Sequence, residues 1–178
     1  VAGSWYFDAA LYASSHNLML GTSPTEFSPN ITMTRGMLVT VLYRMNGSPS
    51  VSGKTPFTDV RTDEWYSAAV LWAYQNGIVT GMSDTTFAPI NNVTREQMAT
   101  ILFRYTKTAA PDKAKASADL SGFADAGSVN DWAVDAMRWA VGQKLIAGIT
   151  LEQSVYLQPR GNATRAQAAT VLTRYYAQ

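Results

Sequence analysis

The sequence contains no cysteine and a single histidine, His16. Without cysteine there are no disulfides, no thiolate nucleophiles and none of the common structural zinc sites. One histidine excludes a multi-histidine metal site and leaves only one possible base for a Ser-His-Asp triad. We therefore expect no metal, no cofactor and no catalytic residues.

Charge is also scarce. Charged residues make up 15% of the chain, against about 25% in a typical globular protein. The low charge excludes charge-driven disorder, and the formal net charge of +1 lacks the basic excess that marks nucleic-acid binders. We expect no nucleic-acid partner.

Long apolar runs are absent as well. The longest one, Ala68 to Tyr74, is far shorter than the roughly 20 residues that cross a bilayer. The first residues, 1–5, have neither a basic start nor an apolar core, so no signal peptide is visible. We expect no membrane insertion, and 178 residues suit one compact unit.

What the sequence does contain is a threefold internal repeat. Each copy opens with a tryptophan and later carries a Thr-Arg pair. The tryptophans are Trp5, Trp65 and Trp132, and the pairs are 34–35, 94–95 and 164–165. The third copy is longer in the loop between its glycine and its proline. We place the copies at 1–47, 55–108 and 121–178.

Each copy is predicted to form helix, loop, helix. In the first helix, apolar residues such as Trp65, Ala69, Trp72 and Ala73 follow helical spacing. The threonine of each Thr-Arg pair is a good N-cap for the second helix. One helical hairpin cannot bury its own apolar face, so the three should pack together. We predict an all-α fold with three helix-loop-helix repeats in a pseudo-threefold arrangement around a central helical bundle.

The arginine of each pair, Arg35, Arg95 or Arg165, falls in the first turn of its helix, where the dipole disfavours a cation. Local rules tend to be broken at functional sites, and an arginine beside free helical N–H groups would form a pocket for an anion. The alternative is a structural salt bridge to Asp59 or Asp125.

Three other sets of residues recur in every copy. The tryptophans either pack in the core or present a ring to a sugar at a groove wall. The glycines Gly21, Gly81 and Gly148 indicate a tightly packed or left-handed backbone. The arginines Arg44, Arg104 and Arg174 are interpreted as structural, because a cation is favoured in the last turn of a helix.

The combined motifs resemble the S-layer homology module along the whole chain. They are Phe57-Thr58-Asp59-Val60, Phe87-Ala88-Pro89, Thr94-Arg95-Glu96-Gln97 and Phe123-Ala124-Asp125. The resemblance implies a three-pronged spindle of helical hairpins with ligand grooves between neighbouring modules. It implies a non-catalytic anchor that holds exported bacterial proteins to secondary cell wall polymers, often through pyruvylated N-acetylmannosamine.

From this resemblance we expect an extracellular unit in the cell wall or S-layer, monomeric and attached to a larger exported protein. Its partner would be an anionic, pyruvylated wall polysaccharide. Expected ligand-binding residues are Arg35, Arg95, Arg165, Asp59, Asp125, Trp5, Trp65, Trp132, Gly21, Gly81 and Gly148. The expected grooves combine Arg35 with Asp59 and Trp65, Arg95 with Asp125 and Trp132, and Arg165 with Trp5.

The chain departs from the family pattern in its first and third copies. Copy one lacks the Phe-x-Asp start, and Val1 aligns with the end of that tetrad, so we expect the chain to begin inside a module. Copy three has Tyr156-Leu157-Gln158-Pro159 in place of Phe-x-Pro. We therefore expect Arg35 and Arg95 to bind ligand and Arg165 to contribute little.

Two other function classes remain open. A wall glycoside hydrolase needs two carboxylates, about 5–5.5 Å or about 6.5–9.5 Å apart, but no Asp or Glu position recurs in all three copies. A helical-repeat scaffold for protein partners would present peptide-sized apolar grooves rather than small arginine-lined pockets. The anchor interpretation is favoured.

Overall fold

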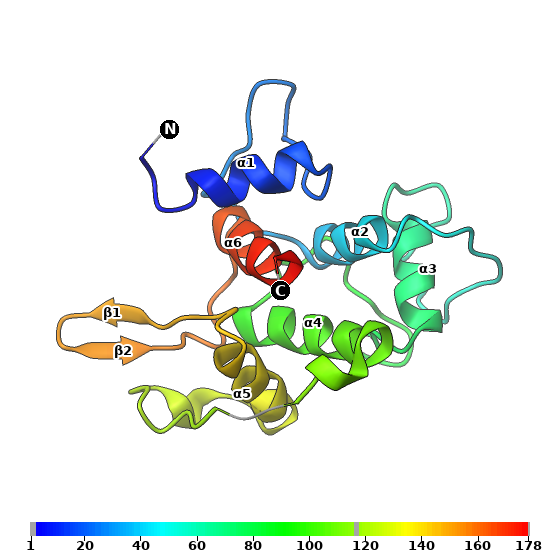
Figure 1. Cartoon of the computed structure of the whole chain (residues 1–178). Helices are drawn as coiled ribbons and strands as arrows, with labels where there is room; N and C mark the ends of the chain where they lie inside the picture. The colour runs from blue at the N-terminus through cyan, green and yellow to red at the C-terminus, as the bar shows by residue number, and fades with distance from the viewer. Residues whose placement is uncertain (1–2, 116–117, 178) are drawn as a thin grey trace.

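The computed structural model describes residues 3–115 and 118–177, and it is mostly helical (Figure 1). The helices are α1 (Phe7–Ser15), α2 (Arg35–Met45), α3 (Ser67–Gln75), α4 (Arg95–Ala109), α5 (Val134–Gly142) and α6 (Arg165–Tyr176). Short 3-10 turns are η1 (Pro111–Lys113), η2 (Ala126–Ser128) and η3 (Asp131–Ala133). No helix in the described part of the chain is long and apolar enough to cross a bilayer.

Copy three also contains a small antiparallel hairpin, which the all-α prediction missed. Strand β1 (Ile149–Leu151) pairs with β2 (Ser154–Tyr156), and the hairpin projects from the helical body in Figure 1. The loop of copy three is longer than the other two loops, and the extra length lets its two sides form a ladder.

The second helix of each copy begins where the sequence predicts. Thr34, Thr94 and Thr164 have extended backbone, and each hydroxyl accepts a hydrogen bond from the N–H three residues later. Gln97 and Gln167 complete capping boxes. These caps are local features, so the sequence alone determines them.

The helices pair between copies rather than within a copy, which differs from the predicted hairpins. Helix α3 of copy two packs against α2 of copy one, α5 packs against α4, and α1 packs against α6 (Figure 1). The first helix of each copy therefore covers the second helix of the preceding copy, and α1 of copy one covers the last.

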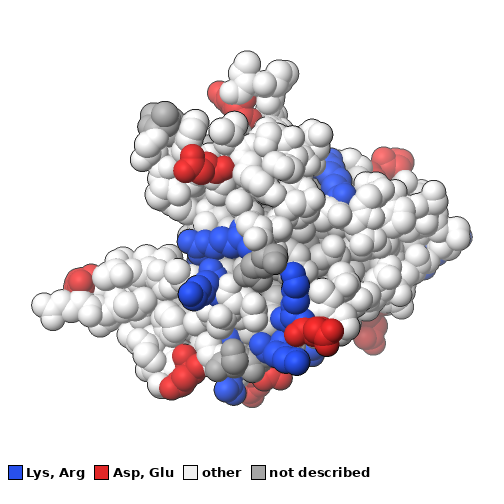
Figure 2. Space-filling view, viewed as in Figure 1, with Lys and Arg blue, Asp and Glu red and all other residues white. Residues whose placement is uncertain are grey.

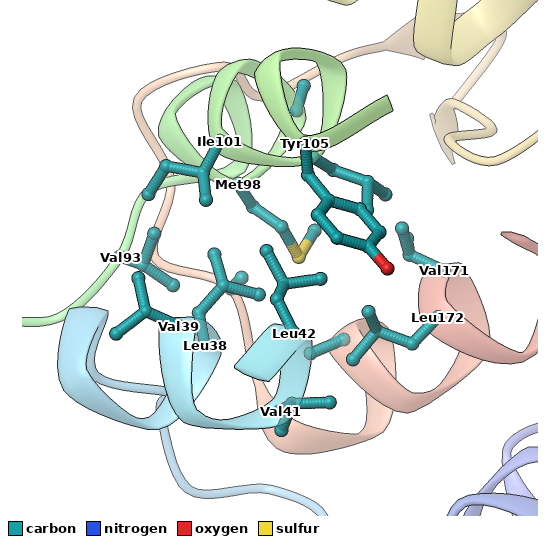
Figure 3. Close-up of a cluster of buried hydrophobic side chains, with 14 of the residues drawn as sticks. Leu38, Val39, Val41, Leu42, Val93, Met98, Ile101, Tyr105, Val171 and Leu172 are labelled. Atoms are coloured by element: carbon teal, nitrogen blue, oxygen red, sulfur yellow. The ribbon is translucent and has the colours of Figure 1, made fainter. Parts of the chain in front are cut away.

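Side chains from α2, α4 and α6 meet in one apolar cluster. Figure 3 shows Leu38 and Leu42 pointing towards Met98, and Leu172 approaching the same space from α6. All four are at most 1% exposed. The second helices thus form the core, and the three helices depend on one another for burial.

Hydrogen bonds close this arrangement into a cycle. The N–H of Val93 donates to the carbonyl of Met33, that of Ala163 to Val93, and that of Met33 to Ala163. These residues end the three loops, just before the N-caps. The three second helices therefore start from one shared hydrogen-bonded point.

Candidate functional site

The arginine at the start of each second helix is buried and holds the loop of the next copy. Arg35 Nε donates to the Phe87 carbonyl at 2.9 Å, and Arg95 Nε to the Leu157 carbonyl at 2.7 Å. Arg165 Nε completes the cycle by donating to the carbonyl of Phe27 in copy one at 2.9 Å. Each of the three arginines is 5% exposed.

Two of these arginines make a second bond to the same loop. Arg95 Nη2 donates to the Ala147 carbonyl at 3.1 Å, and Arg165 Nη2 donates to the Leu20 carbonyl at 2.7 Å. Arg35 has no corresponding hydrogen bond among the described residues; its Cζ lies 4.7 Å from the centroid of the Phe87 ring. Among the three arginines, Arg35 therefore has the fewest hydrogen bonds from its terminal guanidinium nitrogens.

The helical N–H groups beside the arginines are not free, which corrects the expected anion pocket. The N–H of Arg35 donates to Asn91 O and that of Gly36 to Pro89 O, and the same pattern recurs at α4 and α6. The loop of the next copy supplies these carbonyls. Their partial negative charge also compensates the cation that the dipole disfavours.

Burial lowers the pKa of Arg35 to about 10, although the nearby carboxylate of Asp59 acts in the opposite direction. Burial likewise lowers the pKa of Arg95, opposed by Asp125, and lowers the pKa of Arg165. A pKa of about 10 leaves Arg35 cationic at neutral pH.

Asp59 and Asp125 fix the other side of the same loop peptides. The Asp59 carboxylate accepts from the N–H of Phe87 at 2.9 Å and of Ala88 at 2.7 Å. Asp125 accepts from Leu157 and Gln158 in the same way, both at 2.7 Å. The alternative of a direct salt bridge from Arg35, Arg95 or Arg165 to Asp59 or Asp125 is not found among the described residues. Arg35 and Asp59 instead bind one shared peptide, as do Arg95 and Asp125.

We predict that Asp125→Ala lowers the free energy of unfolding by about 2–4 kcal/mol, because two backbone N–H groups lose an ionised acceptor. Denaturant unfolding monitored by circular dichroism measures the change. Asp131→Ala is a matched control, since this exposed aspartate has no hydrogen-bond partner among the described side chains. Equal stability of the two variants would contradict the anchoring role of Asp125.

A cavity of about 360 Å³ lies where all three copies meet. Copy one contributes Arg35 and copy three contributes Trp132 to its wall. Copy two supplies the rest, namely Val79, Thr80, Gly81, Met82, Gln97, Thr100, Ile101 and Arg104. The wall thus carries two arginines and no acidic residue, and Trp132 stands at it with 54% of its surface exposed. We call this the copy-two cavity.

An equivalent but smaller cavity of about 160 Å³ lies at copy one. Its wall includes Arg165 from copy three, Arg44 from α2 and Trp65 from copy two. It again has two arginines, one tryptophan and no acidic residue. We call this the copy-one cavity.

The hollow at copy three is lined differently. It contains Arg174, Lys144 and Gly148 but neither Arg95 nor Trp5. Arg174 Nη1 donates to the carbonyl oxygens of Lys144 and Leu145, at 3.4 and 3.2 Å. This copy-three hollow therefore lacks the arginine–tryptophan pair that lines the other two cavities.

The predicted arginine–aspartate pairs do meet, Arg35 with Asp59 and Arg95 with Asp125, but the tryptophans in the cavities differ from those predicted. Arg35 shares a cavity with Trp132 rather than Trp65, and Trp65 stands with Arg165. The reason is the helix pairing between copies. Arg35 and Arg165 each extend into the next copy, and the copy after that supplies the tryptophan of the cavity wall.

Other predicted site residues are placed as follows. Trp5, Trp65 and Trp132 precede the first α-helices by two residues and are 54–68% exposed, so they are surface residues rather than core. Gly81 has φ +84°, and a Cβ on it would lie 2.6 Å from Phe57 Cε1. The tight backbone predicted for this glycine is thus confirmed.

Arg44 and Arg104 are cavity residues that the sequence analysis assigned to structure alone. Helix α4 continues to Ala109, so Arg104 lies more than a turn before its end and the helix dipole does not explain it. Its Nη1 donates to Thr80 Oγ1 at 3.3 Å. An arginine recurs at this position in every copy, and that repetition is the sequence feature that could have indicated a functional role.

Figure 2 shows how charge is distributed on one face. Lys and Arg side chains gather towards its middle, and most acidic side chains lie nearer the rim. No group of three potential metal-ligating His, Cys, Asp or Glu residues occurs in the described part of the chain.

The model of the S-layer homology domain matches three stretches, residues 1–36, 56–99 and 122–169. The chain belongs to the S-layer homology family. Domains of this family anchor S-layer and other surface proteins to the bacterial cell wall, and the module itself is non-catalytic.

Curated relatives include both enzymes and surface-layer proteins. An endoglucanase of Bacillus sp. (strain KSM-635) is 33% identical over 170 residues, which is 96% of this chain and 17% of the relative. The surface-layer 125 kDa protein of Lysinibacillus sphaericus is 32% identical over 154 residues, 86% of this chain and 12% of the relative. An amylopullulanase of Thermoanaerobacterium thermosulfurigenes is 28% identical over 97% of this chain and 9% of the relative.

The chain thus spans less than a fifth of the length of these relatives. The shared part is the S-layer homology region. Together with the surface-layer relatives, this membership indicates the bacterial cell surface as the location of the chain.

Proposed function

We propose that this chain is a non-catalytic anchor that binds an anionic, pyruvylated secondary cell wall polysaccharide in its inter-copy cavities. The observation that carries the proposal is the copy-two cavity, where Arg35, Arg104 and Trp132 come from three different copies. Two cations on a cavity wall that carries no acidic residue attract a carboxylate, and an exposed indole offers a face for a sugar ring.

The size of the copy-two cavity supports this choice of ligand. Small-molecule sites commonly measure about 300–1,000 Å³, and this cavity of about 360 Å³ falls within that range. The copy-one cavity, at about 160 Å³, falls below it. The copy-three hollow, at about 740 Å³, also falls within the range but lacks the arginine–tryptophan pair, so we assign the principal sugar site to the copy-two cavity.

The proposal includes the wider setting of the chain. The unit is extracellular, monomeric and linked to a larger exported protein, whose cargo in the relatives is in some cases a carbohydrate-active enzyme. We also infer that the three copies are related by approximate threefold symmetry, which the cyclic hydrogen bonds at the loop ends support.

The test is calorimetric titration with matched wall-sugar fragments. Removing the pyruvate acetal should weaken binding by about tenfold or more, because a charge-assisted contact is worth roughly 1.5–3 kcal/mol. Removing one hydroxyl distant from the acetal should cost less. Equal affinities for the pyruvylated and unpyruvylated fragments would contradict an anionic ligand.

A further inference from the structure

We propose that Glu96 is a positioning residue that holds Trp132 at the wall of the copy-two cavity through Asn130. Glu96 lies in the first turn of α4 and is 3% exposed, which makes it the one buried acidic residue in the described part of the chain. Its role rests on the proposed function, because the position of Trp132 matters only if the copy-two cavity binds a sugar.

The Glu96 carboxylate binds one residue of copy three twice. Glu96 Oε1 accepts a hydrogen bond from Asn130 Nδ2 at 2.6 Å, and Oε2 accepts one from the backbone N–H of Asn130 at 3.1 Å. On its other side, Asn130 Oδ1 accepts from Arg160 Nη2 at 3.4 Å. Each N–H of Asn130 faces a different oxygen, so an amide at position 96 would turn a donor towards a donor.

Asn130 in turn fixes the short turn that carries the tryptophan. It is the N-cap of η3, and Trp132 is the middle residue of that three-residue turn, which packs against α4. Asparagine is a favoured N-cap because its side chain can bind the N–H groups of its own helix, but Asn130 makes no such bond. Its amide is bound to Glu96 instead. The start of the turn is therefore held from α4, two residues before Trp132.

Trp132 lacks the support that the other two exposed tryptophans have. Trp5 and Trp65 each contact the ring of the tyrosine that follows them, edge to face, with centroids 5.4 and 5.1 Å apart. Residue 133 is alanine, and Trp132 has no such ring contact in the described part of the chain. The hydrogen bonds from Glu96 thus take the place of a neighbouring tyrosine.

The same exchange is visible on the facing helix. Residue 96 in α4 corresponds to Gly36 in α2, and Ala133 corresponds to Tyr66. Tyr66 is 6% exposed and its ring packs on Gly36, where a Cβ would lie 3.4 Å from two ring atoms. A small residue therefore faces a large one at both contacts, with the two sides interchanged. In each case an exposed tryptophan is placed at the wall of a cavity.

A tryptophan that is held in place before a sugar arrives lowers the cost of binding. We expect Glu96→Gln to weaken binding of the pyruvylated fragment by about twofold to tenfold, because the turn with its indole must then be ordered on binding. Calorimetric titration of the whole chain measures the change. Glu152→Gln is the charge-matched control, since Glu152 lies exposed in the turn of the β hairpin and should bind normally.

A double-mutant cycle separates positioning from stability. In a Trp132→Ala background, Glu96→Gln should cause no further loss of affinity, because no indole is left to position. The fall in Tm that Glu96→Gln causes should be the same in both backgrounds. A purely structural role for Glu96 would lower the affinity equally with and without Trp132, and that result would overturn the proposal.

A swap variant tests the exchange directly. Combining Glu96→Gly with Ala133→Tyr rebuilds the contact that Gly36 and Tyr66 make between copies one and two. Affinity lost in Glu96→Gly alone should return in the pair, because the new tyrosine would support Trp132 as Tyr66 supports its own neighbour. A folded double variant whose affinity stays as low as that of Glu96→Gly would contradict the exchange.

A measurement without any glycan tests the contact by itself. The chain contains five tryptophans, so fluorotryptophan labelling gives a short fluorine NMR spectrum in which Trp132→Phe assigns the resonance of Trp132. Glu96→Gln should shift or broaden that resonance and leave those of Trp5 and Trp65 unchanged. An unchanged Trp132 resonance would overturn the proposal whether or not a glycan binds. Failure of the proposed function differs: the unaltered protein would not bind the pyruvylated fragment, and Glu96 would then have no ligand to serve even though the fluorine spectrum responds.

Discussion

Replacing Arg95 with alanine is expected to lower the free energy of unfolding by about 2–5 kcal/mol. The change leaves the carbonyls of Leu157 and Ala147 without their donors, and each buried unsatisfied group costs about 1–3 kcal/mol. For a chain of this size, such a loss corresponds to a fall in Tm of roughly 5–15 °C. Denaturant and thermal unfolding both measure it.

Two matched variants sharpen this test. Arg35→Ala should destabilise less, because Arg35 makes a single hydrogen bond to its loop. Arg61→Ala should leave stability nearly unchanged, since this exposed arginine forms only a surface ion pair with Asp63. If Arg95→Ala unfolds like Arg61→Ala, the inter-copy bonds do not hold the structure together.

The expected destabilisation matters for how binding is tested. Arginine-to-alanine changes at 35, 95 or 165 alter both the fold and any ligand contact, because these side chains are buried and bonded to a neighbouring copy. A loss of affinity in such a variant does not by itself identify a ligand residue. An arginine with an exposed head in the same cavity is the better probe.

The sequence predicts those parts of the fold that depend on residues only a few positions apart in the chain. The threonine N-caps at residues 34, 94 and 164 follow from spacing within a few residues. Each of these was confirmed. The family motifs are equally local, which is why the family could be recognised from the chain alone.

The features that the sequence analysis missed depend on contacts between copies. Nothing local to Trp65 shows that it stands beside Arg165 rather than Arg35. Nothing local to the start of α2 shows that its N–H groups meet carbonyls of copy two. The pairing of helices across copies decides both, and it is a property of the assembled unit.

Arg104→Ala is expected to weaken glycan binding by about tenfold to a hundredfold, on the basis of the proposed function. The guanidinium lines the copy-two cavity, and its only described bond is to Thr80 Oγ1 at 3.3 Å, so it is available to an acidic substituent. One charge-assisted hydrogen bond accounts for the size of the effect. Stability should change little, because the bond to Thr80 is long and exposed.

Alanine substitutions at the equivalent arginines of the other two copies rank the three cavities by their contribution to glycan affinity. Arg44→Ala should cost less affinity, because the copy-one cavity is less than half the size of the copy-two cavity. Arg174→Ala should cost least, since its Nη1 is bonded to two carbonyls and no tryptophan stands beside it. Calorimetry with the pyruvylated fragment measures all three. A loss of binding in Arg174→Ala, with Arg104→Ala unaffected, would move the principal site to the copy-three hollow, where Lys144 would have to supply the second cation.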